Sequence, residues 1–356
     1  MLDLNALLKY AGENGASDIH ITVGISPLIR VSGKLRPTPF QRMTTADTLE
    51  VFLGIVSPVQ RDKFESAGEI DLSVSIPGAG RYRVNAYKQR GSITLALRLV
   101  EMEIPEPATL MIPDVVLDMC NMHRGLIVIS GPSGSGKTTL MAAMIDRINT
   151  MSESCIVTLE DPIEYLHSHR NSIVSQREIG LDTASYTTGI MAALREDADV
   201  ISLSAMPDEK VATQAIMAAQ TGRLVFTNMY TSGIVETVEA IISLFPEYQQ
   251  EMARNQLASC LRAVITRQLC DGVHGERIPA YGIMLSNKKI ASYIRSGEMR
   301  KIMDVVRESP DLGMISMDDS LFDLYVRGLI SSATALTLSN DQESMEERVE
   351  KHQTMV

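Results

Sequence analysis

The sequence has no tryptophan, few cysteines and no long apolar run. Its four cysteines lie 35, 105 and 10 residues apart, which gives neither the C-x-x-C pairs of a zinc site nor the dense pattern of a disulfide framework. We therefore expect no metal cluster. The thiols are expected to be buried or half-exposed at Cys120, Cys155, Cys260 and Cys270.

A membrane-spanning segment is also missing from the pattern. Spanning a bilayer takes about 20 consecutive apolar residues, whereas the longest apolar runs, such as Leu126–Ile129, have the length of a core strand. Near the start of the chain, Asp3 and Lys9 interrupt the apolar stretch that a signal peptide requires. These features predict a cytoplasmic protein.

Basic residues are fewer than acidic ones. The 33 Lys and Arg residues against 44 Asp and Glu residues give a formal charge of −11, which opposes general binding to nucleic-acid phosphates. Apolar residues make up 45% of the chain and charged residues 22%, as in folded globular proteins. At roughly 150 residues per domain, the 356 residues predict two to three domains.

The first 100 residues have the pattern of a small α+β domain. Apolar residues at helical spacing over Leu4–Ala11 predict an amphipathic helix that ends at the glycines that follow. Alternating apolar and polar residues over Ser17–Val23, followed by a run over Leu28–Leu35, predict a half-buried hairpin. A second hairpin is predicted over Gly80–Val100.

Prolines and acidic residues over 101–113 predict an extended linker, so the domains are predicted to span 1–100 and 114–340. Beyond the linker, short apolar runs alternate with helical stretches, as in βαβ units with a mainly parallel sheet. The runs are Leu126–Ser130, Ile156–Leu159, Val200–Leu203 and Leu224–Asn228. After residue 246 the pattern is chiefly helical, and 341–356 is a charged tail with little to bury.

The sharpest motif is Gly131–Thr138, which matches G-x-x-x-x-G-K-[ST] between an apolar run and a stretch of good helix formers. In such a loop, backbone N–H groups and the helix N-terminus face the phosphates of a nucleotide. Lys137 is expected to reach the β- and γ-phosphates, and Thr138 to ligate Mg²⁺. A flexible glycine turn is the alternative, which both flanks disfavour. The candidate nucleotide-binding residues are Gly131, Ser133, Gly134, Ser135, Gly136, Lys137, Thr138 and Thr139.

Two adjacent carboxylates, Glu160 and Asp161, follow the next apolar run and are stopped by a proline. A carboxylate at this position can orient the attacking water or support the metal shell. Glu160 is therefore the candidate catalytic residue. An acidic turn at a strand end is the alternative, and the phosphate loop makes it the weaker one.

Several segments resemble the secretion-type ATPases, specifically the type IV pilus retraction ATPases PilT and PilU. These segments are Gly131–Thr138, Thr158–Glu164, Gln176–Glu178 and Leu194–Asp197. Two stretches, Ile163–Asp182 and Leu321–Gly328, favour the PilU branch. The resemblance implies an α/β chain in which a PAS-like N-terminal α+β domain precedes a RecA-like P-loop ATPase domain with a helical C-terminal part. The assembly branch usually carries a four-cysteine zinc module that this sequence lacks, which favours a retraction type.

The resemblance also implies a hexameric ring in which the N-terminal domain packs against the ATPase core of the next subunit, with ATP at that junction. Arg81, Arg83 and Arg98 are the arginines that would then reach a neighbouring subunit's phosphates. An ordinary solvated strand face is the alternative for these three residues.

Several positions depart from the family's pattern. Ser204 and Ala205 occupy the positions of a Gly-Glu pair after the second core strand, so the family's glutamate is missing. Arg223 and Tyr230 replace the two histidines of the histidine box. The Ala205 side chain cannot accept a hydrogen bond or carry charge, and losing a general base or its partner costs on the order of 10²–10⁴ in rate. We therefore expect ATP binding to survive and hydrolysis to weaken.

Two functions follow from these observations. The first is an ATP-driven motor subunit of pilus retraction in twitching motility, bound to the inner-membrane pilus platform as a homo-hexamer or as a mixed ring with a PilT-like ATPase. The second is a non-hydrolysing, nucleotide-binding adaptor of the same motor. Both require ATP and Mg²⁺ and neither involves nucleic acid. A phosphate-loop kinase is a weaker third interpretation, because no lid-like basic segment follows the core.

Overall fold

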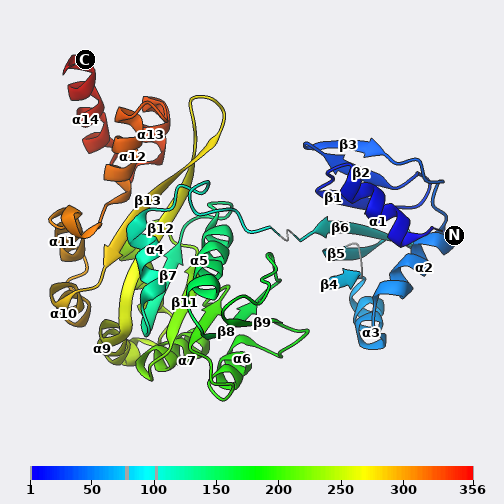
Figure 1. Cartoon of the computed structure of the whole chain (residues 1–356), viewed down its shortest axis with the longest axis horizontal. Helices are drawn as coiled ribbons and strands as arrows, with labels where there is room; N and C mark the ends of the chain where they lie inside the picture. Colours follow the sequence, from blue (N-terminus) through cyan, green and yellow to red (C-terminus); the bar gives the residue numbers. More distant parts are fainter. Residues whose placement is uncertain (1, 77–79, 101–102, 356) are drawn as a thin grey trace. The chain divides into compact units, whose positions relative to one another are not determined.

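The structure, a computed structural model, describes residues 2–76, 80–100 and 103–355. Its chain divides into one unit of Met1–Met102 with Glu164–Leu166 and a second unit of Glu103–Ile163 with His167–Val356. Each unit has its own sheet, and Figure 1 labels the helices and strands of both units. Residues 101 and 102 of the predicted linker lie outside the described residues, and its Ile104 and Leu110 pack against the core of the second unit.

The first unit is built on a six-stranded sheet in which neighbouring strands are antiparallel. The strands are β1 Asp18–Ile21, β2 Leu28–Val31, β3 Lys34–Pro37, β4 Glu69–Ile76, β5 Gly80–Gln89 and β6 Ser92–Leu99. Their order across the sheet is β3-β2-β1-β6-β5-β4. The first strand of the unit therefore pairs with the last one.

Two tight turns shape this sheet. Arg90 and Gly91 join β5 to β6 with φ angles of 50° and 79°, as a two-residue hairpin turn of type I′ requires. The predicted second hairpin is thus confirmed. Ser32 and Gly33 make a similar turn, with φ angles of 49° and 78°. This turn splits the predicted run Leu28–Leu35 into β2 and β3, and only β2 pairs with β1.

Three helices share one core with this sheet. They are α1 Leu4–Glu13, α2 Thr45–Ile55 and α3 Pro58–Ala67. The sequence pattern predicts α1, whereas α2 and α3 carry no such prediction. Phe52 and Phe64 join α2 to α3 with ring centroids 4.4 Å apart, and both are fully buried. Burying one such side chain contributes about 1.5–3 kcal/mol.

The second unit contains a seven-stranded sheet in the order β13-β12-β7-β11-β10-β8-β9. The strands are β7 Gly125–Ser130, β8 Cys155–Glu160, β9 Ile173–Glu178, β10 Val200–Leu203, β11 Leu224–Met229, β12 Leu261–Asp271 and β13 Arg277–Leu285. All neighbours are parallel except β12 and β13. The predicted parallel sheet is therefore confirmed, and the carboxyl ends of its parallel strands share one edge.

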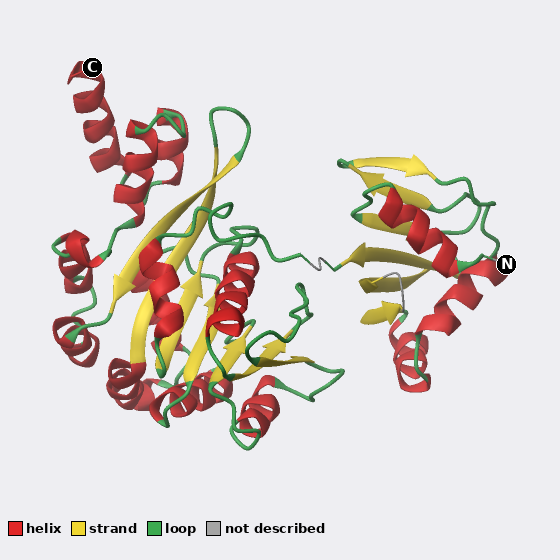
Figure 2. Cartoon of the chain, viewed as in Figure 1, coloured by secondary structure: helices red, strands yellow, loops and turns green. Residues whose placement is uncertain are grey.

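Helices cover both faces of this sheet (Figure 2). Alternate residues of β7 face opposite cores, with Ile127 and Ile129 on one side and Leu126 and Val128 on the other. The first core is completed by α4 Asp114–Asp118, the short 3-10 helix Met119–Asn121 and α5 Lys137–Met151. The second is completed by α6 Tyr186–Ala193, α7 Glu209–Gln220, α8 Ile234–Ser243, α9 Gln250–Cys260, α10 Lys288–Ser296 and α11 Lys301–Arg307.

The chain after residue 246 is chiefly helical, as predicted, but the sequence pattern did not predict two strands in it. The two long strands β12 and β13 lie in this region, and β12 is the direct neighbour of β7. Polar residues interrupt the apolar run of β12, which hides its strand pattern, but pairing on both sides buries most of it.

The C-terminal segment forms three helices, α12 Met317–Val326, α13 Ser332–Leu338 and α14 Gln342–Met355. Met345 and Val349 of α14 are buried in a small core with α12 and with β12 and β13. The prediction of a tail with little to bury is corrected accordingly, because these two residues at i, i+4 spacing form an apolar stripe on an otherwise charged helix.

All four cysteines are free, and Cys155 is the one that is not buried, as predicted for the thiols. Within the described ranges, no helix combines the length and the apolar character that crossing a membrane requires.

Candidate functional site

The phosphate loop joins the buried strand β7 to α5 at the carboxyl edge of the second sheet. Gly131, Gly134 and Gly136 have φ angles of 151°, 77° and 80°, a region that favours glycine. Ser133 and Gly134 are exposed at the tip of the loop, whereas Ser135 is buried. The predicted order of strand, loop and helix is therefore confirmed.

Two of these glycines are also needed for close packing. A Cβ atom on Gly131 would lie 2.2 Å from the backbone oxygen of Arg267, and one on Gly136 would lie 3.2 Å from the Arg267 guanidinium carbon. At Gly134 a Cβ atom would meet open space, so only its φ angle favours glycine. The base of the loop is thus pressed against β12.

Lys137 is the buried cation of the loop, with 7% of its surface exposed. Its Nζ donates hydrogen bonds to the carbonyl oxygens of Gly131 and Pro132, each at 2.8 Å. The same Nζ lies 4.5 Å from the centroid of the Tyr230 ring. The structure therefore brings Tyr230, which follows β11, directly onto the lysine of the phosphate loop.

Three buried polar atoms near this edge have no hydrogen-bond partner among the residues that the structure describes. They are Ser135 Oγ, Thr227 Oγ1 and Asn228 Oδ1. Ser135 belongs to the loop, and the other two lie near the end of β11, the neighbour of β7. A buried group without a partner costs about 1–3 kcal/mol. The hydroxyl of Ser135 can donate to a phosphate oxygen, so these residues fit a nucleotide.

Arg267 is a site residue that the sequence analysis did not identify. It is 3% exposed, and its Nη1 donates to the carbonyl oxygen of Gly136, the N-cap of α5, at 3.0 Å. Its guanidinium lies 5.5 Å from the ring centroid of Tyr281, its partner across β12 and β13. Burial raises the pKa of Tyr281 to about 12. The signal in the sequence that could have identified Arg267 is its position within an apolar run. Charged residues are rarely buried without a partner, so an arginine in such a run indicates a specific contact.

The end of β10 carries no carboxylate. Ser204 Oγ accepts a hydrogen bond from the backbone N–H of Asp161 at 3.1 Å and lies 2.7 Å from the hydroxyl of Tyr186. Burial raises the pKa of Tyr186, which keeps this hydroxyl protonated at neutral pH. Ala205 is half-buried against the apolar core. Ser204 thus anchors neighbouring segments, and Ala205 serves packing.

Glu160 ends β8 on the same edge. Its Oε1 accepts hydrogen bonds from Thr158 Oγ1 at 2.6 Å and from Gln176 Nε2 at 2.9 Å. Gln176 lies on β9, on the side of β8 away from β7. β8 is three strands from β7, or about 14 Å at about 4.8 Å per strand. The role of Glu160 in orienting water stays a prediction.

The structure separates the two positions predicted as the altered histidine box. Arg223 precedes β11 and Tyr230 follows it, so about 23 Å of strand lies between them at about 3.3 Å per residue. The carbonyl of Arg223 accepts a hydrogen bond from the N–H of Gly125, at the start of β7. Of the two, Tyr230 lies at the phosphate loop, and the replacement of two family histidines by Arg223 and Tyr230 stays a prediction.

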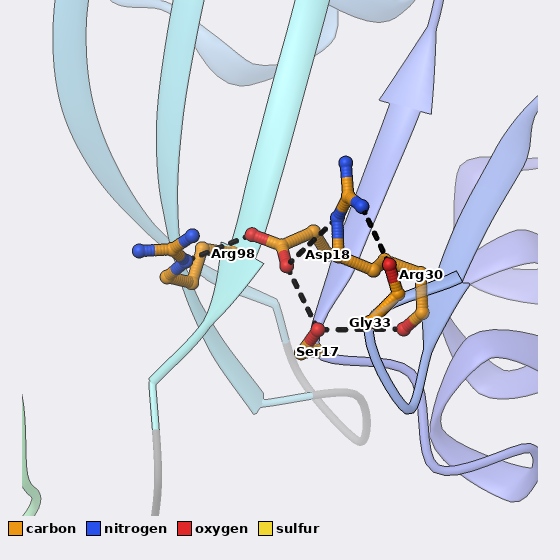
Figure 3. Close-up of polar contacts among 5 residues, drawn as sticks. All are labelled: Ser17, Asp18, Arg30, Gly33 and Arg98. Atoms are coloured by element: carbon orange, nitrogen blue, oxygen red, sulfur yellow. Dashed lines mark hydrogen bonds and ion pairs between the residues drawn. The ribbon is translucent and has the colours of Figure 1, made fainter. Parts of the chain in front are cut away.

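The three predicted inter-subunit arginines lie in the first unit. Arg83 on β5 and Arg98 on β6 are directly opposite each other, and Arg81 lies two residues before Arg83 on the same face. Arg98 Nε donates to Asp18 Oδ1 at 2.8 Å (Figure 3), and Arg83 Nη2 lies 4.0 Å from Asp71 Oδ1. The structure thus groups these arginines, while their action on another subunit stays a prediction.

Histidines near the ATPase sheet belong to a loop. His169 Nδ1 accepts a hydrogen bond from the N–H of Val174, and burial lowers the pKa of His167 to about 4. In the part of the chain that the structure describes, no three His, Cys, Asp or Glu residues are grouped to hold a metal ion. Thr138, predicted to ligate Mg²⁺, lies half-buried in the first turn of α5.

Comparison with curated proteins gives long matches. The family described as type II/IV secretion system protein matches residues 2–296. The chain is 33% identical over 334 residues to the type IV pilus retraction ATPase PilT of Pseudomonas aeruginosa, which covers 94% of this chain and 97% of the relative. It is 32% identical over 336 residues to the type IV pilus ATPase PilU of the same organism, which covers 94% and 88%.

Comparison with solved structures agrees with these matches. The crystal structure of the pilus retraction motor PilT with bound ADP has a TM-score of 0.90 and 39% identity, and the match covers 98% of this chain and 100% of that chain. The ATPase DotB of Legionella pneumophila has a TM-score of 0.82 and 25% identity, with coverage of 92% and 93%. The predicted fold, an N-terminal domain followed by a RecA-like ATPase domain, is confirmed. The chain belongs to the type II/IV secretion ATPase family and, within it, to the type IV pilus retraction ATPases of the PilT and PilU kind.

Proposed function

We propose that this chain is a nucleotide-binding subunit of a type IV pilus retraction motor, of the PilU type, whose own ATP hydrolysis is weak. Relatives named as pilus ATPases support the motor role. The observation that supports weak hydrolysis lies at the carboxyl edge of the ATPase sheet. There Ala205 supplies no carboxylate, and the Tyr230 ring lies on Lys137.

ATP and Mg²⁺ are the proposed ligands of the phosphate loop. The positive φ angles of the loop glycines and the buried, unpartnered hydroxyl of Ser135 support a phosphate ligand. Lys137 would bind the β- and γ-phosphate oxygens in place of the loop carbonyls, and Thr138 would hold the metal. When bound, Mg²⁺ neutralises negative charge on the phosphates.

Weak hydrolysis follows from the placement of charge. Phosphoryl transfer depends mainly on positioning and electrostatic stabilisation. Ala205 cannot supply the charge that the family's glutamate supplies, and Glu160 is the remaining candidate to orient water. Losing a positioned general base or its partner costs on the order of 10²–10⁴ in rate, whereas binding through the phosphate loop is retained.

The PilU assignment rests on the sequences of Ile163–Asp182 and Leu321–Gly328, which resemble that branch. In this proposal a PilT-like ATPase is the partner that supplies most of the hydrolysis. The motor is a homo-hexamer or a mixed ring, and it works on the cytoplasmic side of the inner membrane against the pilus platform protein. Arg81, Arg83 and Arg98 belong to the first unit and the phosphate loop to the second, and in this proposal the three arginines act on the nucleotide of another copy.

A second function is favoured by the contact of Tyr230 with Lys137. A lysine held by loop carbonyls and an aromatic ring suits a subunit that binds nucleotide and does not turn it over. Such a chain would be an adaptor that joins the motor and transmits its assembly state.

The test is steady-state ATP hydrolysis by the purified full-length chain, alone and mixed with a PilT-like ATPase. Low turnover alone and increased turnover in the mixture support the proposal. Glu160→Gln in the mixture separates the two functions, because it lowers turnover only if this chain hydrolyses ATP there. Lys137→Ala is the binding control and removes nucleotide-induced thermal stabilisation, whereas Lys289→Ala, at an exposed position of α10, retains it.

A further inference from the structure

Four charged side chains form a row across the sheet of the first unit. Asp18 on β1 is paired in register with Arg30 on β2 and with Arg98 on β6, and Arg98 is paired with Arg83 on β5. Directly opposite residues on antiparallel strands share one face of the sheet. The order on this face is therefore Arg30, Asp18, Arg98 and Arg83, with one carboxylate among three guanidinium groups.

Asp18 is tightly held within this row, as Figure 3 shows. Its side chain is 13% exposed, and its carboxylate accepts hydrogen bonds from Ser17 Oγ and Arg98 Nε, each at 2.8 Å. Arg30 Nε lies 3.8 Å from Oδ2. Burial raises the pKa of Asp18, but the hydrogen bonds from Ser17 and Arg98 together lower it by more than burial raises it. The pKa of Asp18 is therefore below its ordinary value. The carboxylate is therefore ionised at neutral pH.

Arg98 contacts Asp18 through Nε. The Arg98 side chain is 71% exposed, and its hydrogen bond to Asp18 uses Nε rather than either of the two terminal nitrogens. A long arginine side chain loses rotamer freedom when it is fixed, and here Asp18 fixes it before any ligand arrives. The two terminal nitrogens remain as a fork that matches two oxygens of a phosphate group.

We propose that Asp18 is a positioning residue that orients Arg98 toward the terminal phosphates of a nucleotide bound by another copy of the chain. This inference rests on the proposed function, in which Arg98 acts on a neighbouring copy. A purely structural ion pair is the alternative. Such a pair with an exposed arginine contributes little stability, and loss of Arg30, which lies beside the other carboxylate oxygen, would disturb it as well.

The experiment uses the full-length chain and the variants D18A, D18N, R98A, R30A and the double variant D18A/R98A. Light scattering measures the Mg-ATP concentration for half-maximal ring assembly, and thermal unfolding without nucleotide measures stability. We expect R98A to raise that concentration about tenfold, as for loss of a charge-assisted hydrogen bond, and D18A about fivefold. The double variant should match R98A, because coupled residues are not additive. R30A, the matched control, should change the concentration less than about twofold.

The outcomes separate the inference from the proposed function. If R98A leaves assembly unchanged, the action of Arg98 on another copy fails and the role of Asp18 fails with it. If R98A weakens assembly but D18A does not, or if the two effects add in the double variant, the proposed function survives and the role of Asp18 is overturned. D18N removes the charge at nearly constant shape, so it decides the result if D18A lowers the melting temperature. An equal effect of R30A and D18A also overturns the positioning role.

Discussion

The ring of Tyr230 lies 4.5 Å from Nζ of Lys137, the lysine of the phosphate loop. Lys137 also donates to the carbonyl oxygens of Gly131 and Pro132, so its ammonium group has partners within the protein. A nucleotide phosphate has to replace these contacts in order to bind Lys137. Tyr230 is therefore a competitor of the phosphate for this cation.

Replacing Tyr230 should strengthen ATP binding. A cation–π contact at an exposed site contributes about 0.5–1 kcal/mol, and Tyr230 is 70% exposed. We expect Tyr230→Ala to lower the Kd for Mg-ATP about two- to fivefold in titration calorimetry. Tyr248→Ala, at another exposed tyrosine, is the matched control and should leave the Kd unchanged. Weaker binding by Tyr230→Ala would show that the ring supports the nucleotide instead.

Replacing Arg267 should loosen the base of the phosphate loop. Arg267→Leu removes the charge-assisted hydrogen bond from Arg267 to the carbonyl oxygen of Gly136, which then keeps only the backbone N–H of Leu140 as its donor. We expect the free energy of unfolding to fall by about 1–3 kcal/mol in urea denaturation, together with weaker ATP binding. Arg262→Leu, near the start of β12, is the control. If Arg267→Leu binds ATP like the parent chain, the loop does not depend on this contact.

The phosphate loop was predictable because its chemistry is local. Its glycines, its lysine and both flanks lie within one short stretch, and the φ angles follow from the residue types. Arg267 was not predictable, because only strand pairing brings β12 beside β7. The same limit applies to Arg223, since the length of β11 sets its distance from Tyr230. The contact between Asp18 and Arg98 also depends on pairing across 80 residues of sequence.

Acid should destabilise the chain through His167. Burial lowers the pKa of His167 to about 4, below the ordinary value of about 6.5. Above pH 6.5 the residue is neutral in both states, and as the pH falls toward 4 the unfolded chain gains a proton that the folded chain does not. The free energy of unfolding should fall by about 1–2 kcal/mol between pH 7 and pH 5 from this residue.

Chemical denaturation at several pH values measures this effect. His167→Gln should flatten the pH dependence in that range, because glutamine stays neutral. His274→Gln, in the turn between β12 and β13, should keep the slope of the parent chain. Identical slopes for the parent chain and His167→Gln would contradict the assignment.

Restoring charge at the end of β10 should raise turnover. Ala205→Glu places a carboxylate at the position where the sequence resemblance predicts the family's glutamate, and we expect a partial increase in kcat. Adding Tyr230→His should raise kcat further, because residues that act as a unit are not additive. Ala240→Glu, at a half-buried position in α8, is a control for added charge and should leave kcat unchanged. No gain in either Ala205→Glu variant would remove Ala205 as the cause of weak hydrolysis.

The most direct test is the steady-state kcat of the isolated full-length chain, measured beside its Kd for Mg-ATP and beside a PilT-like ATPase under the same conditions. The prediction is ATP binding within about threefold of the PilT-like enzyme and a kcat lower by on the order of 10²–10⁴. Robust hydrolysis by the unmodified, partner-free chain that disappears in Glu160→Gln would contradict it. That result would show that Glu160 is sufficient for catalysis without a carboxylate at position 205.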